Sequence, residues 1–377
     1  MHLTFVFPCL NEEGTLATCI HAVKQSLEPA AQRGELIYEI VVADNGSTDR
    51  SREIALLAGA RVVPVSERGY GAALRGGIEA ALGSYVMFAD ADSTYLYEDA
   101  LALYQKSIKA DADMGIASRM TGKIERGAMP PLHRYLGTPV LTTLINILFK
   151  GRLSDCNSGF RCIRKSAYDQ WGIRSNGMEF ASELLIKALK HRAKTVEIKS
   201  GLRPGPEGRV AHLRTWRDGM RHLLFILSER PRLFEVAGLA LVLICTTLQF
   251  ASLVVGPTNI KGLNIFDLHT KGLMLLGGLT GMQAYLFACV LFLKERDKPL
   301  PITRRSIEID EANLFFLLAG LCLVQAMLVG AVIANWALHN FANLDLAQVL
   351  FPIIHFLTLP GMLAVGLLAL HVLKKSD

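Results

Sequence analysis

The chain has 377 residues, of which 51% are hydrophobic and 20% charged, and its mean hydropathy is +0.31. This length exceeds one ordinary domain, and the composition is too apolar for a soluble protein but too charged for a simple bundle of membrane helices. The net charge of +6 favours anionic partners only weakly. No dense basic stripe with interleaved aromatic residues occurs, which argues against a nucleic acid partner.

The seven cysteines contain no Cys-x-x-Cys pair, so the sequence predicts neither a zinc site nor a disulfide framework and favours a reducing compartment. The first apolar stretch has no basic segment before it and is interrupted at Pro8, which argues against a cleaved signal peptide. We therefore expect the chain to begin in the cytosol.

The first third of the chain alternates short apolar runs with amphipathic stretches. This alternation is typical of an α/β fold in which helices cover both faces of a parallel sheet. We predict strands over residues 3–7, 39–43, 61–65, 85–89 and 114–117, and helices over residues 13–27, 49–57, 72–82 and 97–109. Ligands of such sheets bind beyond the carboxyl ends of the strands, and polar clusters stand at those ends here.

Beyond about Leu233 the sequence becomes apolar. Four runs approach the roughly 20 residues that a membrane-spanning helix needs: residues 233–255, 272–293, 314–338 and 347–373. The loop 294–313 carries five lysines and arginines, whereas the loop 339–346 carries none. Because positively charged loops stay in the cytoplasm, we predict a multi-pass integral membrane protein with its catalytic region and both termini cytoplasmic.

These patterns divide the chain into three parts. We predict a cytosolic domain over residues 1–215, an interfacial amphipathic helix over residues 216–232 and a transmembrane domain with four helices over residues 233–377. Residues 130–150 form a second amphipathic stretch with basic ends. For this stretch and for residues 216–230, two interpretations stay open: a helix in the headgroup layer, or an ordinary helix packed on the sheet.

Two aspartates follow the predicted strand 85–89. Asp90 and Asp92 are two residues apart at a strand end, where their carboxylates can share a hard divalent cation and the diphosphate that it bridges. The alternative for this segment alone is a solvated turn. We take Mg²⁺ or Mn²⁺ as the expected cofactor.

Polar residues also follow two other predicted strands. Asp44 can accept hydrogen bonds from a base or a ribose, while Asn45 and Gly46 form a tight turn and Ser47 is expected to cap the next helix. Glu12 or Glu13 could contact a ribose, although acidic residues in the first turn of a helix are also ordinary dipole partners. A Gly-Tyr-Gly segment at residues 69–71 gives only a weak indication of a phosphate-binding turn.

Taken together, these segments resemble the family 2 glycosyltransferases, whose nucleotide-sugar-binding domain is called GT-A and is Rossmann-like. The order and spacing match over roughly residues 1–120, in Phe7-Pro8-Cys9-Leu10-Asn11-Glu12-Glu13, Val42-Ala43-Asp44-Asn45-Gly46-Ser47-Thr48-Asp49 and Ala89-Asp90-Ala91-Asp92. The branch that looks most similar contains the dolichyl-phosphate mannose synthases and the bacterial polyprenyl-phosphate glycosyltransferases.

Later segments support this branch. Asp155-Cys156-Asn157-Ser158-Gly159-Phe160-Arg161 resembles an Asp-x-x-Ser-Gly-Phe-Arg segment of those enzymes, and residues 179–184 resemble a helix that carries a glutamate. Two positions depart from the family pattern. Thr94 stands where some relatives have a metal-binding glutamine, and the basic loop 203–209 lacks their Ser-Lys ending.

The resemblance implies roles for individual residues. Nucleotide-sugar contacts are expected from Pro8, Asn11, Glu12, Asp44, Asn45 and Asp90, metal ligation from Asp90 and Asp92, and catalytic roles from Asp90, Asp92 and Arg119. The acceptor phosphate is assigned to Arg119, Arg134, Thr138 and Arg209, because guanidinium groups match phosphate oxygens. A basic patch that binds bulk anionic lipid is the competing explanation for the arginines.

The implied reaction moves a hexose, mannose or glucose, from a nucleotide-diphosphate sugar to a polyisoprenyl (dolichyl or undecaprenyl) phosphate. An alkyl phosphate is largely dianionic at neutral pH, so it can attack the anomeric carbon without a strong general base. The family is inverting. Two alternatives are a processive polysaccharide synthase, whose Gln-x-x-Arg-Trp segment does not occur here, and a transporter, for which the spans carry almost no charges.

Overall fold

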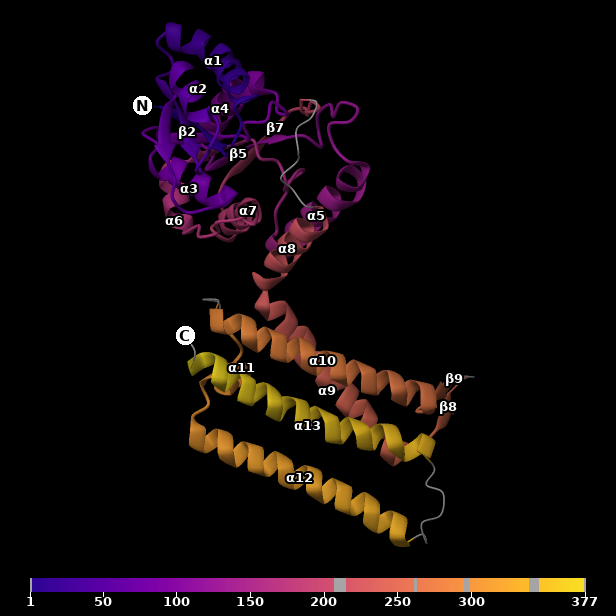
Figure 1. The fold of residues 1–377 in the computed structure, drawn as a ribbon. Coiled ribbons are helices and arrows are strands. Elements are labelled where there is room, and N and C mark those ends of the chain that lie inside the picture. The colour runs from indigo at the N-terminus through magenta and orange to yellow at the C-terminus, as the bar shows by residue number, and fades with distance from the viewer. Residues whose placement is uncertain (1, 207–214, 261–262, 295–297, 339–345, 376–377) are drawn as a thin grey trace. The chain divides into compact units, whose positions relative to one another are not determined.

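The computed structural model describes residues 2–206, 215–260, 263–294, 298–338 and 346–375. The chain forms two compact units, Met1–Leu227 and Ser228–Asp377 (Figure 1). The first contains the sheet and the second contains long apolar helices, so the predicted order of an α/β domain followed by a helical domain is confirmed.

The first unit is built on a seven-stranded mixed sheet with the order β3-β2-β1-β4-β6-β5-β7. Pairing is parallel except along β6, which runs antiparallel to both β4 and β5. The strands are β1 (Leu3–Cys9), β2 (Tyr38–Asp44), β3 (Arg61–Pro64), β4 (Tyr85–Phe88), β5 (Met114–Ser118), β6 (Arg161–Arg164) and β7 (Thr195–Lys199).

All five predicted strands form, but the expectation of a purely parallel sheet is wrong. The interior strand β6 is four residues long and reads Arg-Cys-Ile-Arg, so it lacks the continuous apolar run that marks a buried strand. The edge strand β7 reads Thr-Val-Glu-Ile-Lys, an alternation that fits a strand buried on one face only.

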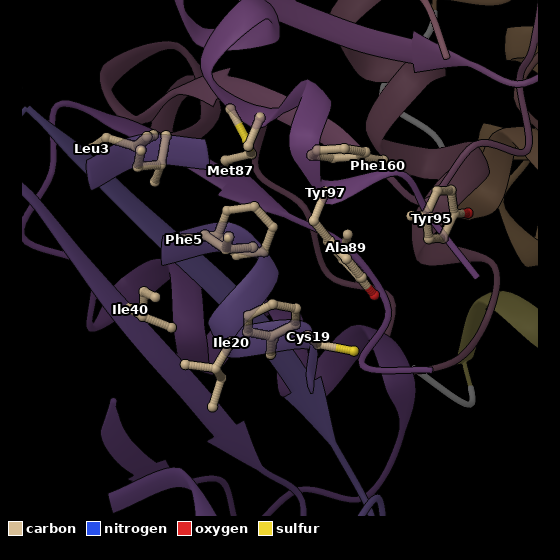
Figure 2. Close-up of a cluster of buried hydrophobic side chains, with 14 of the residues drawn as sticks. Leu3, Phe5, Cys19, Ile20, Ile40, Met87, Ala89, Tyr95, Tyr97 and Phe160 are labelled. Atoms are coloured by element: carbon tan, nitrogen blue, oxygen red, sulfur yellow. The ribbon is translucent and has the colours of Figure 1, made fainter. Parts of the chain in front are cut away.

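Helices cover both faces of the sheet, as predicted. In β1 successive side chains point to opposite faces, so that Phe5 and Phe7 enter one core and Val6 enters the other. The first core is closed by α1 (Leu16–Gln32), α2 (Ser51–Leu57), the short turn η1 (Tyr97–Asp99) and α4 (Ala100–Lys109). Figure 2 shows Phe5 in this core, with Met87 and Ile20 on either side of it.

The second core is closed by the remaining helices of the unit. They are α3 (Tyr70–Glu79), α5 (Thr138–Phe149), which continues the π-helical turn η2 (His133–Gly137), α6 (Lys165–Trp171), α7 (Phe180–Lys190) and α8 (Thr215–Ser228). The amphipathic stretches at 130–150 and 216–230 therefore bury one face each against the sheet domain, through Ile145 and Phe149 of α5 and Ile226 of α8.

The second unit contains α9 (Pro231–Val255), a hairpin of β8 (Thr258–Ile260) and β9 (Leu263–Ile265), α10 (Leu268–Lys294), α11 (Pro301–Glu308), α12 (Glu311–Leu338) and α13 (Leu346–Lys375). Four of these helices are long and apolar enough to cross a membrane: α9, α10, α12 and α13. Each overlaps one of the four predicted spans.

Several polar side chains are buried among these helices. His355 of α13 lies 3.0 Å from the Thr246 hydroxyl of α9, and its ring occupies the space where a Cβ at Gly278 of α10 would stand. Glu235, near the start of α9, accepts the Leu300 N–H at the N-terminus of α11 at 2.7 Å. The carboxylate thereby pairs a backbone N–H at the start of α11 that the helix itself leaves without a partner.

Candidate active site

The loops after β1 and β2 are joined by reciprocal hydrogen bonds. The Asn11 N–H donates to the Ser47 hydroxyl at 3.0 Å, and the Thr48 N–H donates to the Asn11 side-chain oxygen at 2.8 Å. Asn11 adopts a positive φ of 57°, a conformation that asparagine tolerates better than most residues. Glu12 is tied to the same region, since its N–H donates to the Ser51 hydroxyl at 2.9 Å.

The predicted helix cap at Ser47 is wrong. The helix α2 begins at Ser51, and its N-cap residue makes no side-chain capping bond. The Ser47 hydroxyl instead receives the Asn11 N–H, while its own N–H donates to Asp44. The serine thus holds the two strand-end loops together.

Asp44 and Asn45 are both engaged within the protein. The Asp44 carboxylate, with only 1% of its side chain exposed, lies 2.6 Å from the Arg52 guanidinium. Burial alone would raise the pKa of Asp44, but bonds from Ser47 and Arg52 hold it below the ordinary value, so the group is ionised. The Asn45 amide donates to the Glu67 carbonyl at 2.5 Å and accepts the Gly69 N–H at 2.8 Å. Pro8 is buried in β1 beside Ala43.

Asp90 and Asp92 follow β4 next to the start of α1. The Thr15 hydroxyl donates to the Ala91 carbonyl at 2.6 Å, so the acidic segment lies against the loop that carries Glu12. Asp92 accepts the Thr94 hydroxyl at 2.6 Å and the Thr94 N–H at 3.1 Å. Both carboxylates lie near enough to Tyr95 to help raise the pKa of its phenol, after burial as the main cause.

These two carboxylates fit a cation that is shared with a diphosphate. Across the described ranges, no group of three or more His, Cys, Asp or Glu side chains gathers as a metal cage. Mg²⁺ is commonly bound through one or two carboxylates together with substrate phosphates, which does not require such a cage. Thr94, at the position of the glutamine in some relatives, donates to Asp92 and so orients that carboxylate.

Two of the expected acceptor residues, Arg119 and Thr138, contact the segment 155–157. Arg119 forms a bidentate pair with Asp155, at 2.8 Å through Nε and 2.9 Å through Nη2; Asp155 is fully buried and Arg119 is mostly covered. Asn157 donates to the Thr138 hydroxyl at 3.2 Å. Asn157 is not among the site residues predicted from the sequence. The resemblance of residues 155–161 to a segment of related enzymes is the sequence feature that could have indicated Asn157 as a site residue.

The remaining acceptor candidates differ in their placement. Arg134 lies on η2, four residues before Thr138, and its guanidinium is 5.4 Å from the centre of the neighbouring Tyr135 ring. His133 is close enough to Arg119 that, after burial, this charge contributes to the lowered pKa of the imidazole. Arg209 lies outside the described residues.

Comparison with known proteins identifies the family. The model described as "Glycosyl transferase family 2" matches residues 4–172. The low-salt glycan biosynthesis hexosyltransferase Agl6 of Haloferax volcanii is 35% identical over 354 residues, which cover 92% of this chain and 82% of Agl6. The chain belongs to glycosyl transferase family 2.

Two further similarities accompany this assignment. A dolichol-phosphate mannosyltransferase of Pyrococcus furiosus is 25% identical to this glycosyltransferase over 258 residues, covering 65% of this chain and 70% of the relative. The crystal structure of glucosyl-3-phosphoglycerate synthase from Mycobacterium tuberculosis in complex with phosphoglyceric acid has a TM-score of 0.49 and 20% identity, over 60% of this chain and 79% of that one.

The predicted family and enzyme class are thereby confirmed: the protein is a glycosyltransferase. In this glycosyltransferase the family motif 155–161 also has a structural role. Arg161 is 1% exposed and donates to three backbone carbonyls, those of Cys156, Ser158 and Ala181. It therefore fixes the path of the segment that holds Asp155 and Asn157.

Proposed function

We propose that this glycosyltransferase transfers a hexose, mannose or glucose, from a nucleotide-diphosphate sugar to a polyisoprenyl phosphate at the cytoplasmic face of a membrane. In this proposal residues 1–215 are the cytosolic catalytic domain, residues 216–232 an interfacial helix and residues 233–377 the transmembrane domain. The names of two relatives, a hexosyltransferase and a dolichol-phosphate mannosyltransferase, support the proposed sugar and acceptor classes.

The observation that carries the lipid acceptor is an exposed apolar face beside the site. Five large apolar side chains of η2, α5 and the turn before them are exposed, from 39% to 73%: Leu132, Tyr135, Leu136, Val140 and Ile147. Such a contiguous face is costly in water and typical of a surface that meets lipid. Thr138 on the same segment contacts Asn157, so an isoprenoid lying along this face would bring its phosphate toward the strand-end carboxylates.

A second helix, α8, bears on the proposed contact of the domain with the membrane. The helix α8 ends at Ser228 and α9, the first helix long enough to span, begins at Pro231. Only two residues separate them, so α8 must lie close to the bilayer surface if α9 crosses it. Met220 and Leu224 of α8 are 54% and 55% exposed, which suits contact with the headgroup layer.

In the proposed mechanism, Asp90 and Asp92 are the residues that would hold Mg²⁺ or Mn²⁺ together with the donor diphosphate. When bound, this cation neutralises the charge that develops on the departing nucleoside diphosphate. The nucleotide part of the donor is assigned to contacts with Pro8, Asn11, Glu12, Asp44 and Asn45. The acceptor phosphate is assigned to Arg119, Arg134, Arg209 and Thr138. An oxygen of this phosphate attacks the anomeric carbon from the face opposite the leaving group, which inverts the configuration at that carbon. Orientation of the two substrates supplies much of the rate.

The proposal is tested with the full chain purified in detergent. GDP-mannose, UDP-glucose and other nucleotide-sugars are each incubated with dolichyl or undecaprenyl phosphate, and lipid products are separated by solvent extraction. We expect one donor to give a lipid-phosphate hexose in the presence of Mg²⁺ or Mn²⁺. Formation of long glycan chains without any lipid phosphate would instead identify a polysaccharide synthase.

The proposed topology predicts which loops face the cytoplasm. In a variant without native cysteines, single cysteines replace Lys298, between α10 and α11, and Pro257, between α9 and α10. Intact cells are treated with a membrane-impermeant thiol reagent. We expect labelling at position 257 but not at 298, because the basic loop stays inside. Labelling of position 298 alone would reverse the proposed orientation.

Arg134 offers the cleanest test of acceptor binding, because it is not part of a buried ion pair with Asp155 as Arg119 is. We expect Arg134→Ala to weaken use of the lipid phosphate about tenfold, since a hydrogen bond to a charged group contributes roughly 1.5–3 kcal/mol. Arg134→Lys should recover part of this loss. Acceptor kinetics and calorimetric donor binding are measured for each variant.

The control for Arg134 is Arg152→Ala, which removes an exposed arginine just beyond the other end of α5. It should leave acceptor kinetics unchanged. If Arg134→Ala instead lowers donor affinity and leaves acceptor dependence intact, Arg134 belongs to the nucleotide site.

A further inference from the structure

Three side-chain oxygens converge at Gly159, on the loop between Asp155 and β6. A Cβ added to Gly159 would lie 2.9 Å from the Tyr95 hydroxyl, 3.1 Å from Asp90 Oδ2 and 3.5 Å from the Tyr70 hydroxyl. Two tyrosine hydroxyls and one carboxylate of the acidic pair therefore occupy one small volume. Only a residue without a side chain fits beside them.

The fold holds Tyr95 in place from two sides. Its ring packs edge-to-face on Phe160, with the centroids 6.0 Å apart, at the border of the first core. Figure 2 shows its hydroxyl directed away from Phe5 and the other apolar side chains of this core. The hydroxyl accepts the Gly159 N–H at 2.7 Å, so its own proton remains available for a neighbouring acceptor.

The Gly-Tyr-Gly segment of the sequence places the second tyrosine. A Cβ at Gly69 would lie 2.0 Å from the Asn176 carbonyl oxygen, and one at Gly71 would lie 2.4 Å from the Ser175 carbonyl oxygen. The two glycines thus allow the start of α3 to pack directly on the backbone of the 175–177 loop. Tyr70, which lies between them in the sequence, is partly buried against the second core, and its hydroxyl lies beside Gly159 together with Asp90 Oδ2 and the Tyr95 hydroxyl.

We propose that Tyr70 and Tyr95 are positioning residues that hold the Asp90 carboxylate in the orientation required to bind the divalent cation and the donor diphosphate. This inference rests on the proposed function. Gly159 leaves room for both hydroxyls beside Asp90, while Gly69 and Gly71 let the segment that carries Tyr70 pack on the 175–177 backbone.

The choice of tyrosine has a physical reason. A hydroxyl that donates to a carboxylate fixes its direction without cancelling its charge, whereas Arg119 neutralises Asp155 and Arg52 neutralises Asp44. A carboxylate that binds a cation has to keep its negative charge, so a hydroxyl donor suits it better than an arginine. Partners in the second shell of a metal site commonly change metal affinity by 10-fold to 100-fold when they are removed.

The test uses Tyr70→Phe and Tyr95→Phe in the full chain in detergent. Each substitution removes one hydroxyl and keeps the ring, so packing is preserved. The control is Tyr104→Phe, a tyrosine of α4 that is also buried, at 6% exposure, and packs in the first core. Binding of Mn²⁺ is followed by electron paramagnetic resonance in the presence of UDP or GDP, without acceptor, so that the readout does not depend on turnover. Melting temperatures report on the fold.

We expect both variants to bind Mn²⁺ about tenfold or more weakly, while Tyr104→Phe matches the wild type. Because the tyrosines position Asp90 and do not touch the reacting atoms, saturating Mn²⁺ should restore turnover in both variants. Wild-type Mn²⁺ affinity in both variants would overturn the inference, and so would a loss of turnover that saturating Mn²⁺ does not relieve. If the wild-type protein itself binds no Mn²⁺ with either nucleotide, the metal-dependent function fails, and the inference fails with it.

Discussion

Asp92→Ala is expected to abolish hexose transfer while the sheet domain stays folded. The carboxylate lies at a strand end and its contacts to Thr94 are local, so its removal leaves the core of the domain intact. Loss of the group that binds the cation should raise the activation barrier by about 3 kcal/mol or more, which lowers the rate at least about 100-fold. Turnover with extracted lipid acceptor and thermal unfolding are measured together.

The control for this prediction is Asp169→Ala, which removes an exposed carboxylate from α6. It should leave both measurements unchanged and so separates a specific effect from a general loss of negative charge. Wild-type turnover by Asp92→Ala, or by the unmodified enzyme in excess EDTA, would show that Asp92 does not bind an essential metal.

Arg119→Ala is expected to lower the stability of the sheet domain, whatever its effect on substrate binding. Arg119 is 11% exposed and Asp155 is fully buried, so removal of the guanidinium leaves a buried carboxylate without its partner. Breaking a buried ion pair in this way costs about 3–5 kcal/mol. Burial favours the neutral form of Asp155, but Arg119 holds the pKa of this carboxyl below its ordinary value, and that support is lost in the variant. We expect a clear fall in the melting temperature of the sheet domain.

A second substitution identifies the cause of this fall. Asp155→Asn in the Arg119→Ala background removes the buried charge and keeps one of the two oxygens that accept the backbone N–H groups of position 119 and Asn157. The double variant should therefore be more stable than Arg119→Ala alone. An unchanged melting temperature in the single variant would mean that the pair contributes nothing to the fold and that Arg119 is retained for the acceptor alone.

The strand ends of the site could be predicted because they depend on local patterns. Apolar runs mark β1, β2 and β4, and parallel neighbours bring their carboxyl ends to the same edge of the sheet. Asn11, Asp44 and Asp90 each follow one of these runs. Bonds from Asn11 to Ser47 and Thr48 join the first two loops, and the bond from Thr15 to Ala91 brings the third beside them.

Contacts between residues far apart in the chain could not be predicted in the same way. Arg119 and Asp155 are 36 residues apart, and nothing near either residue indicates that the fold pairs them. The antiparallel β6 is recognisable only from its neighbours, since four residues with two arginines carry no strand periodicity. Ser47 fits the composition of a helix cap, but the Asn11 N–H from another loop takes its hydroxyl.

The Gly-Tyr-Gly segment illustrates the same limit for function. Glycines near a helix start are typical of phosphate-binding turns, and the sequence offered no means to see the 175–177 backbone that approaches them. In the structure that backbone occupies the space where a Cβ at Gly69 or Gly71 would stand. The two glycines therefore serve packing, and the residue of this segment with a proposed role in the site is Tyr70, between them.

The order of the strands along the chain has a consequence for biosynthesis. All seven strands of the sheet lie before residue 200, and the first helix long enough to span a membrane begins at Pro231. Domains generally fold as units from the N-terminus while the ribosome is still adding residues. Residues 200–230 separate the end of β7 (Thr195–Lys199) from the start of α9, so the whole sheet is synthesised before the first candidate span. A chain that ends shortly before Pro231 and is released from the ribosome should already protect the strands from proteases, with no membrane present.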